Sequence, residues 1–165
     1  MDSLFDSLQT LEGQDWSAAR FQGRVTVVSF TDQKAQEAST KAASALGKLY
    51  MADPKFQVLT AVKVPSMFKA MAATFLKSGQ VKARVSAVKR LESEGKPVPS
   101  DLAERIHVVF DLNGKCSAAV LDGWNDGEAQ LVVVDPTGAI VAKSSDKDGQ
   151  AAAESVSAKV AELLA

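Results

Sequence analysis

Two runs of mostly apolar, β-branched residues, separated by a helix-favouring stretch, constrain this chain most strongly. Residues 24–31 (RVTVVSFT) and 56–62 (FQVLTAV) are nearly continuous in apolar content rather than alternating, which predicts strands buried on both faces. Between them, residues 33–50 are rich in Ala, Lys, Gln and Glu, and Asp32 is suited to cap a helix there. The pattern predicts a β-α-β unit with parallel strands, and therefore an α/β fold.

Further strands and helices are expected along the rest of the chain. A length of 165 residues fits one domain, so we expect a single domain over residues 1–165 with a helical insert at about 67–104. The expected elements are a helix at 67–91 with a break at Ser78-Gly79, a strand at 106–110, a short strand or turn at 115–121, a hairpin of strands at 129–135 and 139–143, and a helix at 150–164.

The scarcity of cysteine and histidine excludes many catalytic classes. Cys116 is the only cysteine and His107 the only histidine, which excludes an intramolecular disulfide, a multi-cysteine zinc site and most catalytic triads. We expect no cofactor and no metal. The net charge of −1 gives no general attraction to nucleic acid, and no apolar run reaches the roughly 20 residues that span a bilayer.

The first residues do not resemble a signal peptide. They carry two acids, no base and no small-residue cleavage pattern. We therefore expect a cytoplasmic protein, or a periplasmic one if a leader had been removed. We also expect a monomer or weak dimer with an unknown protein partner.

Three stretches carry a resemblance to a known family: FQGRVTVVSFTD at 21–32, VVFDLNGK at 108–115 and QLVVVDPTGAIVAK at 130–143. They resemble the strand before the active site, an Asp-x-x-Gly turn, and the penultimate strand with its hairpin in the redoxin branch of the thioredoxin fold. That branch includes peroxiredoxins and the membrane-tethered thiol-disulfide proteins of bacteria. The resemblance implies a thioredoxin-like three-layer sandwich, a central mixed sheet with helices on both faces.

The cysteines that this family uses are missing. The resemblance places a Cys-x-x-Cys near Ala35 and Ala38, where a helix N-terminus would lower a thiol pKa, but no cysteine lies within residues 24–50. The family's cis-proline before the penultimate strand is replaced by Glu128-Ala129-Gln130. We therefore expect a degenerate, redox-inactive member that binds another protein.

The expected contact surface combines the remodelled active-site region with a basic helix. Lysines and arginines outnumber acids by five between Lys69 and Lys96, although the whole chain is slightly acidic. A solvated helix face is the simpler explanation of that excess. The candidate binding residues are Thr31, Asp32, Gln33, Lys34, Ala35, Gln36 and Ala38 in the active-site region, Lys82, Arg84, Lys89 and Arg90 on the basic helix, and Trp124 in a polar loop.

Two other functions are compatible with the sequence. Cys116, after the Asn113-Gly114 turn, could serve a single-cysteine thiol peroxidase or thiol transferase, although a structural thiol outside any helix N-terminus is the simpler interpretation. The basic helix at 77–90 could instead bind an anion or a membrane surface. His107 is interpreted as a half-buried strand residue rather than a general base.

Overall fold

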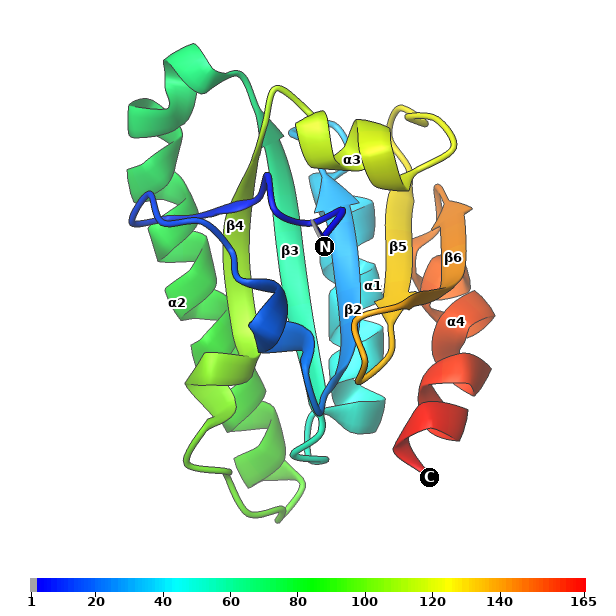
Figure 1. Cartoon of the computed structure of the whole chain (residues 1–165). Helices are drawn as coiled ribbons and strands as arrows, with labels where there is room; N and C mark the ends of the chain where they lie inside the picture. The colour runs from blue at the N-terminus through cyan, green and yellow to red at the C-terminus, as the bar shows by residue number, and fades with distance from the viewer. Residues whose placement is uncertain (1–2) are drawn as a thin grey trace.

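The computed structural model describes residues 3–165 and contains a six-stranded mixed sheet. The strands lie in the order β1-β4-β3-β2-β5-β6 (Figure 1). β2, β3 and β4 are parallel, whereas β1 and β5 run antiparallel to their neighbours β4 and β2, and β6 runs antiparallel to β5. The strands are β1 (Gln9–Thr10), β2 (Val25–Thr31), β3 (Phe56–Val64), β4 (Ile106–Leu112), β5 (Ala129–Val134) and β6 (Ile140–Asp146).

The predicted β-α-β unit is confirmed. β2 and β3 pair in parallel along the whole of β2, from Val25 opposite Phe56 to Thr31 opposite Val62. Every residue of β2 is buried, as expected for a central strand covered on both faces. The helices are α1 (Gln36–Tyr50), α2 (Lys69–Ser93), α3 (Lys115–Val120) and α4 (Gly149–Leu164), with 3-10 turns at Ala18–Phe21, Ser66–Phe68 and Leu102–Arg105.

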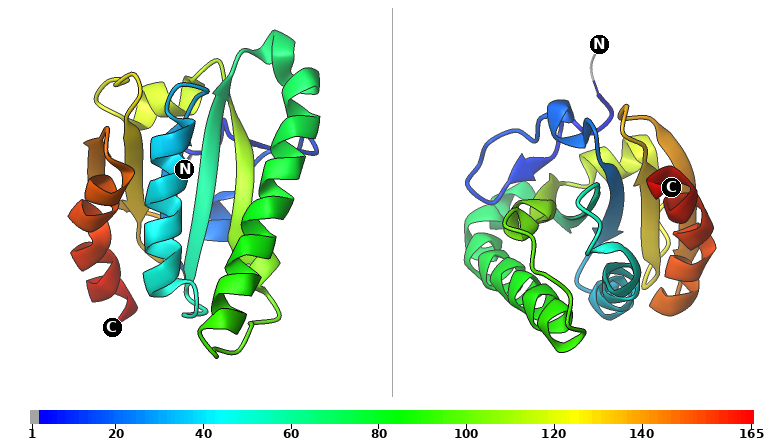
Figure 2. Two further views of the ribbon diagram at one scale, coloured as in Figure 1. Left: turned by 180° about the vertical axis from the view of Figure 1, so that it is seen from behind. Right: turned by 90° about the horizontal axis from the view of Figure 1, so that it is seen from below.

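The sheet separates two helical layers of unequal size. The long helices α1, α2 and α4 cover one face, and residues 3–22 together with α3 cover the other (Figure 2). Alternate residues of β2 divide between the two layers: Val25 and Val27 pack under α1 and α4, whereas Val28 and Phe30 pack under the N-terminal segment. The expected sandwich with helices on both faces is thus present.

Three local expectations are wrong. α1 begins at Gln36 rather than residue 33, because Asp32 Oδ1 accepts the Ala35 N–H at 2.9 Å and holds a separate turn before the helix. α2 has no break at Ser78-Gly79, because it packs along β4 and Gln80 Oε1 accepts the backbone N–H of Val108 at 2.9 Å.

Residues 115–120 form α3 instead of a strand or turn. The buried carboxylate of Asp111 accepts the N–H groups of Cys116 at 2.8 Å and Ser117 at 3.1 Å. These are N–H groups that the first turn of a helix cannot satisfy internally. The helix therefore depends on an acid that lies outside it.

Arg105 forms hydrogen bonds that hold together the end of the sheet at which β3 and β4 begin. The residue is fully buried, and its Nη1 donates to the backbone oxygens of Met51, Asp53 and Phe56, at 3.2, 2.9 and 2.7 Å. Its Nε lies 3.2 Å from Asp101 Oδ1. One side chain therefore joins the connection between α1 and β3 to the start of β4.

Candidate functional site

The candidate site lies at the opposite edge, where β2, β3 and β4 end and α1 begins. We call it the carboxyl edge (Figure 1). β2 leads into the Asp32–Ala35 turn, and Thr31 Oγ1 donates to the backbone oxygen of Asp32 at 3.1 Å. The carboxyl ends of parallel strands are the usual place for ligand binding in α/β sheets.

The two positions that the resemblance assigns to cysteines carry buried methyl groups. Ala35 is 0% exposed and Ala38 is 9% exposed, and neither has a reactive atom. Ser39 is also buried, and its hydroxyl has no hydrogen-bond partner among the residues that the structure describes. The first turn of α1 carries the acid Glu37, which already complements the helix dipole. The start of α1 is therefore poorly suited to stabilise a thiolate.

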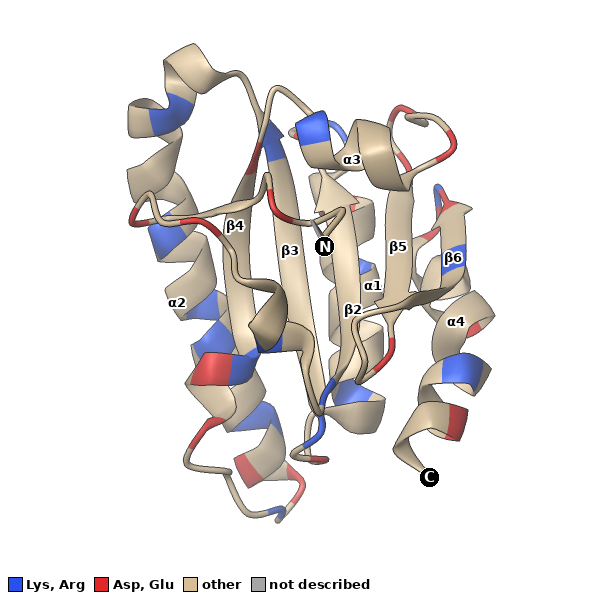
Figure 3. Cartoon of the chain, viewed as in Figure 1, with Lys and Arg blue, Asp and Glu red and all other residues tan. Residues whose placement is uncertain are grey.

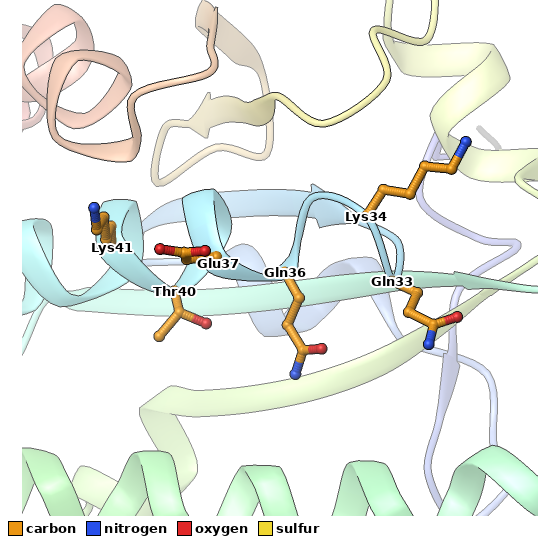
Figure 4. Close-up of a pocket in the computed structure, with 6 residues that line it drawn as sticks. All are labelled: Gln33, Lys34, Gln36, Glu37, Thr40 and Lys41. Carbon is orange, nitrogen blue, oxygen red and sulfur yellow. The ribbon is translucent and has the colours of Figure 1, made fainter.

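Exposed polar side chains surround these buried alanines. They line a shallow, open depression of about 480 Å³ at the start of α1 (Figure 4). In Figure 4, Gln36 and Thr40 project from one side of α1, whereas Lys34, in the turn before the helix, projects in the opposite direction. Of the predicted binding residues here, Gln33, Lys34 and Gln36 are exposed and Asp32 is half-buried, but Thr31, Ala35 and Ala38 are buried and cannot contact a partner directly.

The loop before β5 closes the same edge. Lys34 Nζ lies 4.0 Å from Asp126 Oδ2, and both side chains are exposed. Trp124 is half-buried, and Nζ of Lys63, near the end of β3, lies 4.5 Å from its ring centroid in a cation-π contact. The structure therefore brings the predicted Trp124 and the Thr31–Ala38 segment to one edge, together with Lys63, which the sequence did not suggest.

The junction that replaces the cis-proline is an ordinary trans backbone. No cis peptide bond occurs among residues 3–165. Gln130, directly after Ala129, is buried, and its Oε1 accepts the backbone N–H of Asn125 at 3.2 Å. Its Nε2 has no partner among the described residues. Gln130 thus fixes the position of the loop before β5 through a hydrogen bond from the buried side of that loop.

Cys116 is not at this surface. It is the second residue of α3, so the expectation that it lies outside a helix start is wrong, but the residue is 0% exposed. Burial, reinforced by the nearby carboxylate of Asp111, raises the pKa of the Cys116 thiol to about 12. A thiol with such a pKa supplies almost no thiolate near neutral pH. No group of three or more His, Cys, Asp or Glu residues suited to a metal occurs within residues 3–165.

The predicted basic residues lie on α2, but they do not share one surface. Lys82 and Lys89 are exposed. Arg84 turns inward and donates from Nε to the backbone oxygen of Ile106 at 2.9 Å, and Arg90 approaches Ser44 Oγ on α1 at 3.4 Å. The two arginines therefore connect α2 to the rest of the fold, and only the lysines remain available to a ligand.

His107 occupies β4 as expected, half-buried, with Nε2 against the backbone oxygen of Glu104. Its ring packs edge-on against Trp16, with centroids 5.2 Å apart. Burial lowers the pKa of His107, and the positive charge of Arg84 lowers it further. Nothing nucleophilic accompanies it, so its surroundings are those of a structural histidine.

Comparison with known proteins bears on the fold. The sequence matches no protein-family model and no curated protein. The structure resembles a secreted Mycobacterium tuberculosis disulfide oxidoreductase homologous to E. coli DsbE, with 16% identity over 97% of each chain and a TM-score of 0.53. It also resembles the exposed lipoprotein thioredoxin of Streptococcus pneumoniae TIGR4, with 13% identity over 94% of this chain and 97% of that one and a TM-score of 0.58.

A third similar structure is a Chlorobium tepidum protein with the provisional name thiol:disulfide interchange protein DsbE, at 16% identity over 96% of this chain and 92% of that one, with a TM-score of 0.57. This chain has a thioredoxin-like fold. Its carboxyl edge is thus a thioredoxin-like edge built without paired cysteines.

Exposed apolar residues at the start of α2 and in the 3-10 turn Ser66–Phe68 before it were missed by the sequence analysis. Met67, Phe68, Met71 and Phe75 lie open to solvent. The regular spacing of Met67, Met71 and Phe75 is itself a signal, but the same spacing is typical of a core-facing stripe. Only the position of α2 relative to the sheet separates the two interpretations.

Proposed function

We propose that the protein is a redox-inactive thioredoxin-like module that binds a segment of another protein at its carboxyl edge. The observation that carries the proposal is the chemistry at the start of α1. Ala35 and Ala38 are buried where a dithiol would lie, and polar, exposed residues around them offer hydrogen bonds and charge. The partner segment would lie between the start of α1 and the loop that carries Trp124.

Several further features support binding without thiol exchange. The only thiol, Cys116, is buried and its pKa is raised to about 12. The similar structures include disulfide oxidoreductases, but a likeness of fold does not transfer an activity whose reacting groups are absent. Lys63 and Trp124 would provide a cation and an aromatic surface, and Gln33 and Gln36 would provide amide donors and acceptors.

A peptide-display experiment tests the binding surface. Peptides selected on the wild-type protein from a random library should lose about tenfold or more in affinity for Lys34→Glu and Gln36→Glu. They should bind Lys48→Glu normally, because Lys48 is an exposed lysine in the last turn of the same helix and far along it from the candidate site. Equal losses in Lys34→Glu and Lys48→Glu, or failure to select any peptide, would contradict the proposal.

A thiol assay tests the absence of redox chemistry. The wild-type protein should not reduce insulin in the presence of dithiothreitol, and Cys116 should react with an aromatic disulfide reagent only after unfolding. Turnover of a disulfide or peroxide that disappears in Cys116→Ser would overturn the proposal in favour of a single-cysteine enzyme.

A further inference from the structure

α2 and the 3-10 turn Ser66–Phe68 before it present an unusual outer face at one side of the molecule. Met67 is 81% exposed, Met71 is 77% and Phe75 is 65%, and Phe68 is also exposed. Exposed apolar side chains that occur singly are normal, but here neighbouring ones form a continuous group. We call Met67, Phe68, Met71 and Phe75 the apolar ridge.

The ridge is exposed because it begins where the helix extends past the strands and continues on the helix face that points away from β4. α2 has 25 residues and is therefore about 37 Å long, whereas the 7 residues of β4 span about 23 Å. The first turns of α2 extend past the ends of the strands (Figures 1 and 2). The inner side chains of this half, such as Leu76, pack against β4, so the outer ones are left open to solvent.

The outer face of α2 becomes basic along its length. Residues seven apart lie on the same helix face, so Phe75, Lys82 and Lys89 form one outward stripe, and the exposed Val81 and Val85 lie beside its two lysines. Six residues of α2 are Lys or Arg and one, Glu92, is acidic, which gives the helix a net charge of +5 (Figure 3). Among the described residues, no ion pair neutralises Lys77, Lys82 or Lys89.

The charge of α2 determines what can cover the ridge. A second copy of the chain would bring the exposed Lys82 and Lys89 of two helices close together, which is electrostatically unfavourable. An anionic surface would satisfy both the lysines and the ridge. The ridge side chains are 47% to 81% exposed, so a protein partner would have to supply a matching groove, whereas a bilayer interface accepts exposed apolar side chains without a preformed shape.

We propose that α2 docks the protein peripherally on an anionic lipid bilayer. The apolar ridge enters the interfacial region, and Lys82 and Lys89, which share the outward helix face of Phe75, lie near the lipid phosphates. No described helix is long and apolar enough to cross a membrane, so the contact is with the surface only. The surface is separate from the carboxyl-edge residues Lys34 and Gln36, and the inference does not depend on the proposed protein binding.

Vesicle co-sedimentation tests the inference. The full chain should bind vesicles of phosphatidylcholine containing about one third phosphatidylglycerol at low salt, and binding should fall as salt is raised. Vesicles of phosphatidylcholine alone should bind at least about tenfold more weakly. Absence of binding to the anionic vesicles, or equal binding to both compositions, would overturn the proposal; an acidic protein partner would then be the remaining occupant of the ridge.

Paired variants identify the surface. Met71→Ser with Phe75→Ser should lower the vesicle-bound fraction about tenfold, whereas Leu49→Ser, at a residue 62% exposed on α1, should leave it unchanged. Lys82→Glu with Lys89→Glu should abolish binding, and Lys48→Glu with Lys55→Glu, a matched pair of exposed lysines outside α2, should reduce it only slightly. Equal effects of the α2 variants and their controls would contradict docking through α2. Because all these positions are exposed, circular dichroism should show folded protein in each case.

Discussion

The Nη2 atom of Arg84 lies 3.5 Å from Nδ1 of His107, while Nε2 of the same imidazole lies against the backbone oxygen of Glu104. This arrangement defines the neutral ring: Nε2 carries the proton and Nδ1 accepts from the guanidinium. A proton on Nδ1 would remove the acceptor and place two positive groups side by side. Burial lowers the pKa of His107 most, and Arg84, Arg20 and Arg24 lower it further.

The stability of the protein should therefore fall in mild acid. Because the folded-state pKa of His107 lies below the usual value of 6.5, the unfolded chain binds the proton first as pH decreases. The contribution is complete above pH 6.5 and is lost as pH falls through the folded-state pKa. Urea denaturation followed across this range should show the decline. His107→Gln removes the chain's only imidazole and should flatten that part of the profile; an unchanged profile would show that carboxylates cause the decline.

Restoring the cysteines should not restore a dithiol enzyme. In Ala35→Cys with Ala38→Cys, the first thiol would be buried and would lie close to the acids Asp32 and Glu37, which disfavour a thiolate. The trans junction at residues 128–130 would also remain. We expect insulin reduction indistinguishable from that of the wild type, with both new thiols titrating in denaturant. Substantial turnover would mean that only the cysteines separate this edge from an active one.

Removal of the Asp111 carboxylate should destabilise the protein by about 2 kcal/mol or more, because two buried N–H groups at the start of α3 lose a charged acceptor. Thermal or urea unfolding of Asp111→Ala measures the loss. Asp122→Ala removes a fully exposed acid and should change the stability by less than about 0.5 kcal/mol. Similar values for the two variants would show that α3 does not depend on Asp111.

Gly149 should not tolerate a side chain. A Cβ at this position would lie 2.0 Å from the backbone oxygen of Ala38, because α4 begins in close contact with α1. Gly149→Ala should therefore cost about 1–3 kcal/mol of stability. Gly79→Ala, in the open middle of α2, meets nothing within 4 Å and should instead stabilise by up to about 1 kcal/mol. Chemical denaturation of the two alanine variants gives opposite shifts if this packing is correct.

The strands were predictable because each buried strand is a run of consecutive, mostly apolar residues. β2, β3 and β5 are dense in β-branched side chains, and both faces of each are covered, so sequence and environment agree. α3 was missed for the opposite reason. Its six residues are too few to show a period, and its stabilising acid, Asp111, belongs to the preceding strand.

The candidate site was only partly predictable. The resemblance placed the cysteine positions at Ala35 and Ala38, next to the start of α1 at Gln36, but it could not show that Thr31, Ala35 and Ala38 are buried while Gln33 and Gln36 are exposed. On α2, residue type did not separate the inward Arg84 from the outward Lys82, which lie only two positions apart. That distinction depends on which helix face meets β4, a tertiary relationship.

The hydrogen bonds of Arg105 affect how freely the residues of the carboxyl edge can be substituted. Arg105 joins α1, β3 and β4 at the end of the sheet away from the candidate site, through a single guanidinium and three backbone oxygens. These hydrogen bonds therefore stabilise the fold at an end of the sheet where no ligand is proposed to bind. Substitutions of surface residues at the opposite end need not disturb the hydrogen bonds of Arg105. The fold can therefore be retained while the side chains of the candidate site are replaced. A library randomised at Gln33, Lys34, Gln36 and Thr40 should yield mostly folded proteins.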